Sequence, residues 1–322
     1  MSKDGIPFLF IHRGSAPYLP YILHQAHESN PYSRIILIGD CAACSCGSFV
    51  ETYDIEDYSE KAKLFSDLYR RNHRSFNSFF FENACFQRTY IMENFCRRHK
   101  LEIIWHFDSD VLIFSSLYDI MPEQAFQYAV LLPETVSFSE SRSVSPHTAC
   151  WTLEALTRYN EFLYDCISPG SKFYHELQLF WEKYKQVHSN GGICDMTTLY
   201  LFTKYFSQGL LNLSAISKTS RFSYSYQEEI GWHGSSNRIF RSGNHWKLVD
   251  QKTNKEWFLW SLHMQGDAKW KIPDFYLGEP FKKQTFYFWF ILIFRMKTII
   301  MRKLRNILYR RKTQPSHRKR TS

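Results

Sequence analysis

The chain has 322 residues and lacks an apolar run long enough to cross a membrane. Near the C-terminus, residues 286–294 form only nine apolar positions before Arg295, whereas a spanning helix needs about 20. Residues 1–5 also lack the basic start and the small-residue cleavage site of a secretory signal. We therefore expect the chain to begin and stay in the cytosol.

Acidic residues are missing from one region altogether. Residues 281–322 contain 13 lysines and arginines and no aspartate or glutamate. Because the whole chain carries a formal net charge of +9, residues 1–280 carry −4. The basic excess belongs to the C-terminal segment, so the charge balance gives no support to a nucleic-acid-binding function, and we expect no nucleic-acid partner.

The same C-terminal segment is amphipathic at helical spacing. Its apolar face comprises Phe286, Trp289, Phe290, Ile293, Ile300, Leu304, Ile307 and Leu308. Outside that face lie Arg302, Lys303, Arg305 and Arg310. Aromatic and basic residues together are typical of a helix at a membrane interface, where each cation near an anionic leaflet adds on the order of 1 kcal/mol. We expect a domain over residues 1–280 and a basic amphipathic tail over 281–322 on the cytoplasmic face of a membrane; a helix packed against the domain is the alternative.

Paired cysteines at zinc-finger spacing are also missing. The triplet Cys41, Cys44 and Cys46 is not followed by a second pair of cysteines or histidines at a suitable distance. The eight cysteines are scattered through apolar segments, as expected of reduced thiols used as small hydrophobic residues. The sequence therefore gives little support to a structural zinc site.

Alternating strand and helix patterns open the chain. Residues 6–11 form an apolar run, residues 17–28 have helical spacing, and residues 34–39 form a second apolar run. This order predicts a parallel sheet with a right-handed crossover, and ligands bind beyond the carboxyl ends of such strands. The polar residues at those ends are candidates for a ligand pocket, with ordinary loop residues as the alternative: His12, Arg13 and Asp40.

The octapeptide FDSDVLIF at 107–114 places two carboxylates where an apolar strand opens. Side chains two residues apart in an extended segment lie on one side, so Asp108 and Asp110 can share one hard cation. Two ionised carboxylates without a cation would repel each other and resist desolvation. A solvated turn between two short strands is the alternative to a metal site.

Two segments resemble a known enzyme family. Residues 103–114 resemble the DxD motif of GT-A glycosyltransferases. The sequence WSLHMQGDAKW at 260–270 is similar to the H-x-x-G-x-x-K-(P)-W segment of the galactosyltransferase and glycogenin-like family, although the proline is missing because Trp270 directly follows Lys269. The likeness covers about residues 15–280 coarsely and is sharp only at these two segments.

The resemblance implies a metal and a nucleotide-sugar site. It assigns Mn²⁺ or Mg²⁺ to Asp108, Asp110 and His263, and it assigns Lys269 to the diphosphate of the donor. The ligand-pocket candidates at the strand ends then belong to the nucleotide. On the residues alone, His263 ends an apolar run, and a lone histidine there is more often a satisfied core or strand-end residue than a metal ligand.

Residues 79–100 have the periodicity of a long helix. Its apolar stripe comprises Phe81, Ala84, Cys85, Ile91, Met92, Phe95 and Cys96. Arg88 lies on this stripe and needs an anionic partner, either a protein carboxylate or a phosphate. The resemblance implies that Arg88 faces the sugar nucleotide, and a structural salt bridge is the alternative.

The second half of the chain is less regular. We expect a short strand over 129–132, a mobile Ser- and Thr-rich loop over 135–149, and a helix from Thr152 through Cys166. Trp151 is compatible with an aromatic shelf for an acceptor sugar or with the core.

Asp195 follows two glycines and is expected to cap a helix over 196–206. In the resembled enzymes an acidic residue at this place contacts the donor sugar or the acceptor hydroxyl, which makes Asp195 the candidate catalytic residue; a plain N-cap is the alternative. Met196 stands where the family has a polar residue sometimes proposed as the nucleophile, so the resemblance does not carry a double-displacement mechanism to this chain.

Together these features predict an α/β protein with a GT-A-like, Rossmann-type mixed sheet flanked by helices. The expected activity is metal-dependent transfer of a hexose from a UDP- or GDP-linked sugar to a glycan or lipid-linked acceptor, as in the synthesis of cell-surface polysaccharide or glycolipid. The enzyme would be peripheral on the cytoplasmic face of a membrane. A sugar nucleotidyltransferase and a non-catalytic, membrane-associated nucleotide-sugar-binding protein are the alternatives.

Overall fold

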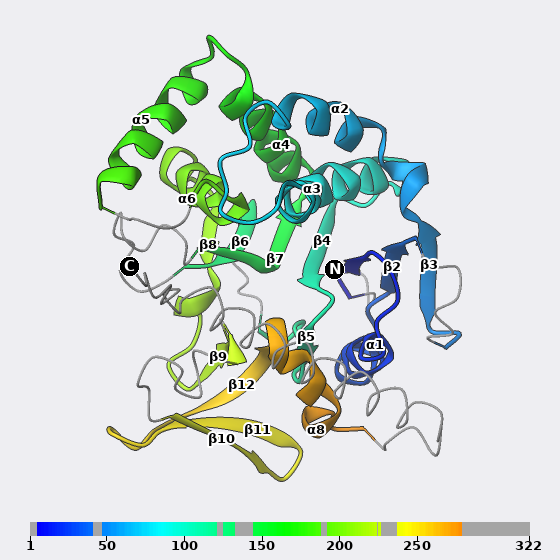
Figure 1. Cartoon of the computed structure of the whole chain (residues 1–322). Helices are drawn as coiled ribbons and strands as arrows, with labels where there is room; N and C mark the ends of the chain where they lie inside the picture. Colours follow the sequence, from blue (N-terminus) through cyan, green and yellow to red (C-terminus); the bar gives the residue numbers. More distant parts are fainter. Residues whose placement is uncertain are drawn as a thin grey trace, which may run out of the picture. The chain divides into compact units, whose positions relative to one another are not determined.

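A computed structural model describes residues 5–40, 47–120, 125–132, 144–187, 192–223, 225–226 and 237–278 of the chain (Figure 1). The chain divides into two units, Met1–Gly278 and Glu279–Ser322. All described residues lie in the first unit, so the predicted tail helix and its basic residues lie outside them. The triplet Cys41, Cys44 and Cys46 does so too.

A seven-stranded sheet forms the centre of the first unit, in the spatial order β3-β2-β1-β4-β7-β6-β8. In chain order these strands are β1 (Phe8–His12), β2 (Ile35–Gly39), β3 (Val50–Asp54), β4 (Ile103–Asp108), β6 (Tyr128–Leu131), β7 (Ser145–Thr152) and β8 (Leu210–Asn212). The first four strands in chain order pair in parallel, and β6 pairs in parallel with β8. β7 is antiparallel to both its neighbours. The predicted α/β class with a mixed sheet is confirmed.

Helices cover the sheet on both faces (Figure 1). The helices and short 3-10 turns are α1 (Leu19–Ser29), η1 (Ile55–Tyr58), α2 (Glu60–Tyr69), α3 (Phe79–His99), α4 (Leu153–Ile167), α5 (Lys172–Val187), α6 (Asp195–Tyr205), η3 (Leu213–Ala215), η4 (Gly266–Lys271) and α8 (Ile272–Phe275). Successive side chains of a strand point to opposite faces, and β1 shows this directly. Leu9 joins the core beneath α2, α3, α4 and α6, whereas Phe8 and Phe10 join the core beneath α1 and α8.

A second sheet lies on the α1 side and supplies one wall of the later site. It has the order β10-β11-β12-β5, with β9 paired to β12. Its strands are β5 (Val111–Ile113), β9 (Ser220–Phe222), β10 (Asn237–Ser242), β11 (His245–Asp250) and β12 (Lys255–His263). The apolar run that begins in β4 therefore breaks at Asp108–Asp110 and resumes as β5 in a different sheet, which links the two sheets at this turn.

Most predicted elements are present within one or two residues of their expected ends. Thr152 caps α4, because its hydroxyl accepts a hydrogen bond from Ala155 N at 3.2 Å. The expected loop over 135–149 is wrong for residues 145–149, which belong to β7; residues 135–143 lie outside the described ranges. The Ser and Thr content of this stretch suggested a loop, but β7 is enclosed between β4 and β6, where its polar backbone groups are paired.

Two side-chain predictions also need correction. Phe81 is 59% exposed and does not belong to the buried stripe of α3; it lies in the first turn of that helix. Trp151 is 1% exposed and stacks on Tyr128 within the core, so the acceptor-shelf interpretation is wrong and the core interpretation is confirmed. Among the described residues, no helix has both the length and the apolar character needed to cross a membrane.

Candidate metal and donor site

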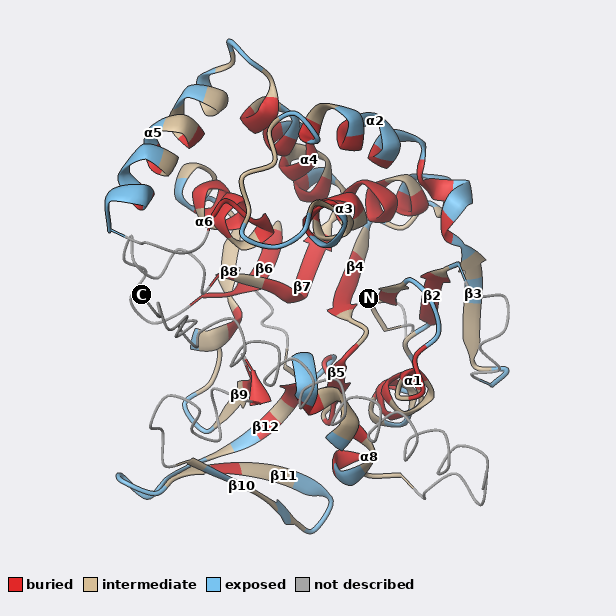
Figure 2. Cartoon of the chain, in the orientation of Figure 1, coloured by how far each residue is buried: buried red, intermediate tan, exposed pale blue. Residues whose placement is uncertain are grey.

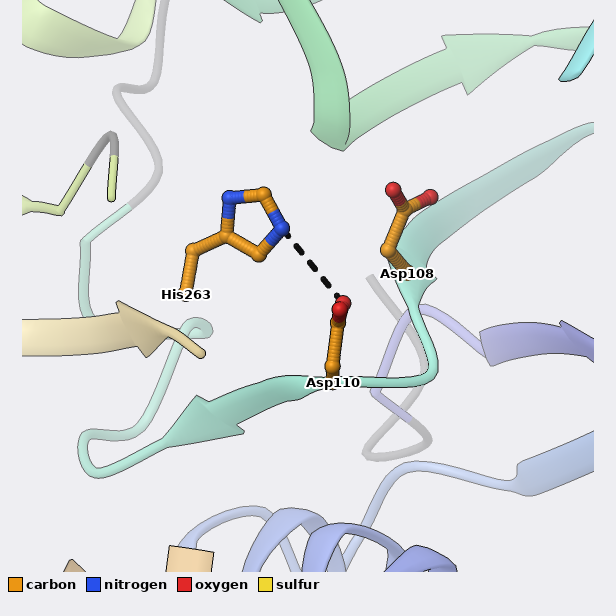
Figure 3. A group of neighbouring side chains, drawn as sticks. All are labelled: Asp108, Asp110 and His263. Carbon is orange, nitrogen blue, oxygen red and sulfur yellow. Dashed lines mark ion pairs between the residues drawn. The ribbon is translucent and has the colours of Figure 1, made fainter. Parts of the chain in front are cut away.

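Three predicted ligands converge at the turn between β4 and β5. Asp108 is the last residue of β4, Asp110 directly precedes β5, and His263 ends β12. One ligand atom from each residue lies within 4.8 Å of the others. Figure 3 shows the His263 ring facing the Asp110 carboxylate, with Asp108 across the same space, and His263 Nε2 lies 3.4 Å from Asp110 Oδ1.

Strand register brings His263 to this turn. In the antiparallel pairing of β12 with β5, His263 lies opposite Val111 and Leu262 lies opposite Leu112. The backbone continues the contact, because Met264 N donates to Asp110 O at 2.9 Å. A shift of the register by one residue would turn His263 away from Asp110, so the β5–β12 pairing fixes the third member of the group.

The donor set suits a divalent cation. Asp110 and His263 are buried and Asp108 is partly buried. Two carboxylate oxygens and an imidazole nitrogen are ligands for borderline and hard divalent metals. The close approach of two carboxylates in a poorly solvated place is also what a bound cation would relieve.

Lys269, at the turn that follows β12, lies beside the same group. Its Nζ is 3.0 Å from Asp110 Oδ2 and 5.7 Å from the centre of the Tyr18 ring. Burial alone would raise the pKa of Asp110, but His263 and Lys269 outweigh it and lower that pKa to about 2. Burial likewise opposes the charge of Lys269, whereas Asp110 raises its pKa above the ordinary value. Both groups are therefore ionised at neutral pH.

Arg88 connects Asp195 to the three candidate ligands Asp108, Asp110 and His263, here called the metal group. Its Nη1 donates to Asp108 Oδ1 at 2.5 Å and its Nη2 donates to Asp195 Oδ2. Burial favours the neutral form of Asp195 and raises its pKa despite the nearby guanidinium. The anionic partner expected for Arg88 is thus a pair of protein carboxylates in this structure. Contact of Arg88 with phosphate stays a prediction.

Asp195 is not the N-cap of its helix. α6 begins at Asp195 and its N-cap is Cys194, so the expected cap is one residue late. Instead, Asp195 Oδ1 accepts a hydrogen bond from Met196 N at 2.8 Å, while the other oxygen meets Arg88. The carboxylate is therefore turned towards Arg88 and, through it, towards Asp108.

The candidates at the ends of β1 and β2 are only partly brought to the metal group. His12 Nδ1 lies 2.8 Å from the Ser109 hydroxyl, inside the Asp108–Asp110 turn. Asp40 is exposed and accepts a hydrogen bond from Gly14 N at 2.6 Å, and Gly14 has φ of +77°, which a side chain would disfavour. Arg13 is exposed, with a long 3.5 Å contact to Gln87. Arg13 and Asp40 thus line the loop beside the site rather than the metal group.

Two histidines of the site were not predicted. The His147 ring stacks on His263 at 4.1 Å, and its Nε2 donates to Ser223 O at 3.1 Å. His106 Nδ1 donates to Leu9 O at 3.2 Å, and its Nε2 lies 3.4 Å from Asp108 Oδ1. The His106 ring thus lies beside Asp108, and the His147 ring packs against His263. The two-residue alternation of β4 puts His106 on the same face as Asp108 and was a usable signal, whereas His147 depends on the position of β7.

Comparisons with known proteins give structural likenesses only. No protein-family model and no curated protein sequence matches the chain. Mouse xyloside xylosyltransferase 1 is similar at 12% identity over 70% of this chain and 90% of that one, with a TM-score of 0.45. The galactosyltransferase LgtC, solved with donor and acceptor sugar analogues, is similar at 12% identity over 82% of this chain and 89% of that one, with a TM-score of 0.42. The bifunctional glycosyltransferase WbbM is similar at 8% identity over 69% of this chain and 40% of that one, with a TM-score of 0.39.

Proposed function

We propose that this chain is a metal-dependent glycosyltransferase that moves a hexose from a nucleoside-diphosphate sugar to a glycan or lipid-linked acceptor. The observation that carries the proposal is the convergence of Asp108, Asp110 and His263 at the carboxyl edge of the sheet, with Lys269 3.0 Å from one of the carboxylates. Ligands of open α/β sheets bind at this edge. A cation site with an adjacent lysine suits a diphosphate.

The proposed metal is Mn²⁺ or Mg²⁺, held by Asp108, Asp110 and His263. One imidazole nitrogen among oxygen ligands favours Mn²⁺ over Mg²⁺, which binds to proteins mainly through oxygen. When bound, such an ion would stabilise the charge that develops on the leaving diphosphate. His106 and His147 would keep the Asp108 and His263 side chains in orientation, as groups behind metal ligands commonly do.

Lys269 is proposed to exchange partners when the donor binds. In this structure it offsets the charge of Asp110. Once Asp110 binds the metal, the Lys269 ammonium group can donate to a diphosphate oxygen and stabilise the leaving group. His12 is proposed to contact the nucleotide, because its buried Nε2 has no hydrogen-bond partner among the described residues. Arg13 and Asp40 complete this proposed nucleotide end of the site.

Asp195 is proposed to contact the transferred sugar or the acceptor hydroxyl. Arg88 contacts both the Asp195 carboxylate and Asp108, and so keeps Asp195 close to the metal group. Arg88 would also present positive charge towards the diphosphate. Burial raises the pKa of Asp195, and a carboxylate whose pKa is raised towards neutrality is better able to accept a proton from a hydroxyl.

A donor-hydrolysis assay tests this function. The full chain is incubated with UDP- and GDP-hexoses and Mn²⁺, and released nucleoside diphosphate is measured for the wild type, Asp110→Asn and the exposed control Asp119→Asn. We expect Mn²⁺-dependent release by the wild type and the control and a loss of about 100-fold or more in Asp110→Asn, which should still be folded at the assay temperature. Near-wild-type turnover in Asp110→Asn would remove the basis of the proposal. Pyrophosphate release from a nucleoside triphosphate and a sugar phosphate would instead assign a nucleotidyltransferase.

A further inference from the structure

The segment that joins α2 to α3 exposes an unusual set of side chains. Residues 70–81, here called the aromatic-basic loop, contain four phenylalanines, three arginines and one histidine, and no aspartate or glutamate. Phe76, Phe80 and Phe81 are 76%, 78% and 59% exposed. Figure 2 shows the connection between α2 and α3 coloured as exposed at its ends and intermediate between them, with no buried part. Exposed aromatic residues gathered in one place mark interaction surfaces on soluble domains.

The aromatic-basic loop lies at the same edge of the sheet as the candidate site. A helix that leads into a parallel strand begins near the carboxyl edge of the sheet, so the start of α3 lies on the side where Asp108 ends β4. Arg88, which contacts Asp108, is seven residues after Phe81, or about 10 Å along the helix axis. The loop also touches the segment that leads to Asp195, because Ile193 N donates to Arg74 O at 3.1 Å.

Local contacts anchor the aromatic-basic loop on the folded unit. Ser78 caps α3 by accepting a hydrogen bond from Phe81 N. The Arg70 guanidinium lies over the Phe79 ring, 4.4 Å from its centre, and Arg74 donates to Gln178 of α5. The loop is thus anchored at both ends, while the side chains of Phe76 and Phe80 are exposed to the surroundings of the protein.

We propose that the aromatic-basic loop docks on an anionic lipid bilayer. Aromatic side chains at the headgroup level together with arginines that meet anionic lipids are the chemistry of interfacial binding. A second copy of the chain fits less well, because Arg70 and Arg71 of the two copies would face each other without an acidic residue in the loop to offset them. Docking would turn the carboxyl edge of the sheet towards the membrane. The idea that this orientation presents the site to a membrane acceptor rests on the proposed function, but the membrane contact itself does not.

Site-specific photo-crosslinking of the full chain tests the contact. Benzoylphenylalanine replaces Phe80 in one variant and Tyr118 in a control. Tyr118 is 67% exposed, and the backbone N–H of its neighbour Leu117 donates to Asn30, which lies before β2 at the opposite edge of the sheet. We expect lipid adducts from position 80 on phosphatidylcholine–phosphatidylglycerol vesicles and none from position 118. No adduct at position 80, equal adducts at both positions, or protein–protein adducts from position 80 without lipid would overturn the proposal.

A matched pair of variants measures the contribution of the loop. Phe76→Ser/Phe80→Ser removes two rings that are 76% and 78% exposed, and Tyr32→Ser/Tyr118→Ser removes two that are 79% and 67% exposed at the opposite edge. We expect the loop variant to bind anionic vesicles about tenfold more weakly and the control to bind like the wild type. Equal binding by all three proteins would overturn the proposal. Donor hydrolysis should be unchanged in both variants, so a chain that crosslinks to lipid but releases no nucleotide would contradict the proposed function and leave the membrane contact standing.

Discussion

At the scale of single residues, each carboxylate of the site has a cationic partner. Asp110 meets Lys269, and Arg88 meets both Asp108 and Asp195. Burial alone would disfavour the ionised form of all three acids, yet Arg88 lowers the pKa of Asp108 well below its ordinary range. Asp195 keeps a raised pKa, because the effect of its burial exceeds that of the guanidinium. Of the two acids that share Arg88, Asp108 is therefore held in its ionised form, whereas Asp195 is the more readily protonated.

Arg88→Met should destabilise the fold as well as the site. Removing the guanidinium leaves the partly buried Asp108 and the buried Asp195 as neighbouring acids without a counter-charge, and breaking a buried pair typically costs about 3–5 kcal/mol. Urea unfolding at pH 7 measures this loss, with Arg98→Met on the exposed face of the same helix as the control. Arg88→Met/Asp195→Asn should recover part of the stability. A loss below about 1 kcal/mol in the single variant would contradict the burial of this bridge.

The sequence predicted individual site residues unevenly. Spacing alone paired Asp108 with Asp110, because alternation along a strand needs no tertiary information. His263 and Lys269 were reached only through the resemblance. Their approach to Asp110 depends on the pairing of β12 with β5, which no local pattern encodes. The contact between Arg88 and Asp195 joins residues 107 positions apart, so only the assembled fold could reveal it.

At the scale of secondary-structure elements, Glu93 ties three helices together. It lies on α3 with its side chain 3% exposed. Its carboxylate accepts hydrogen bonds from Asn160 of α4 at 2.8 Å, from Arg97 at 2.8 Å and from Lys61 of α2 at 3.3 Å. Burial opposes the ionised form of Glu93, but these donors outweigh burial and lower its pKa below the ordinary value for glutamate.

Glu93→Gln should therefore change how stability depends on pH. Because the folded-state pKa of Glu93 is lowered, its contribution is fully present above the pKa of the unfolded chain and is lost as the pH falls through the folded-state value. The variant should be about 1–3 kcal/mol less stable than the wild type at pH 7. This difference should shrink below about pH 4.3. Urea unfolding across this pH range measures the stability difference, with the exposed Glu161→Gln as the control. A difference that does not change with pH would contradict the role of the ionised Glu93 carboxylate.

Element positions were predicted better than their partners. The β-α-β order gave the parallel strands β1 and β2 and the helix between them. β7 was missed, because Ser145 and Thr148 resemble loop residues until the strands that enclose them are known. The sequence also did not predict that β4 and β5 belong to different sheets, because residues 103–114 resemble one interrupted strand.

At the scale of the whole molecule, basic and aromatic residues without acidic neighbours in the sequence occur in two parts of the chain. Residues 284–322 carry 11 lysines and arginines without an acid, and the aromatic-basic loop adds a second basic and aromatic surface on the first unit. The proposed acceptor, a glycan or lipid-linked molecule at a membrane, agrees with both features. Composition could predict the basic tail, but it could not predict which part of the folded unit exposes its aromatic residues.

Deletion of residues 284–322 should separate chemistry from localisation. The truncated chain should hydrolyse the donor in solution at the wild-type rate, bind anionic vesicles more weakly and lose most transfer to membrane-embedded acceptors. The electrostatic part of vesicle binding by the full chain should fade with salt, since exposed charges are screened beyond about 8 Å at physiological ionic strength. Vesicle sedimentation measures the binding. Equal binding by the truncated and full-length chains would contradict a membrane role for the tail.

The most direct test of the proposed metal site is Mn²⁺ binding followed by electron paramagnetic resonance, with and without the sugar nucleotide. The wild type and His245→Ala, which changes an exposed histidine of β11, should bind the ion equally. His263→Ala should weaken binding by about an order of magnitude or more, and Asp110→Asn should abolish donor-dependent binding. Unchanged Mn²⁺ titrations in both site variants, with only thermal stability reduced, would show that these side chains are core residues and would contradict the metal site.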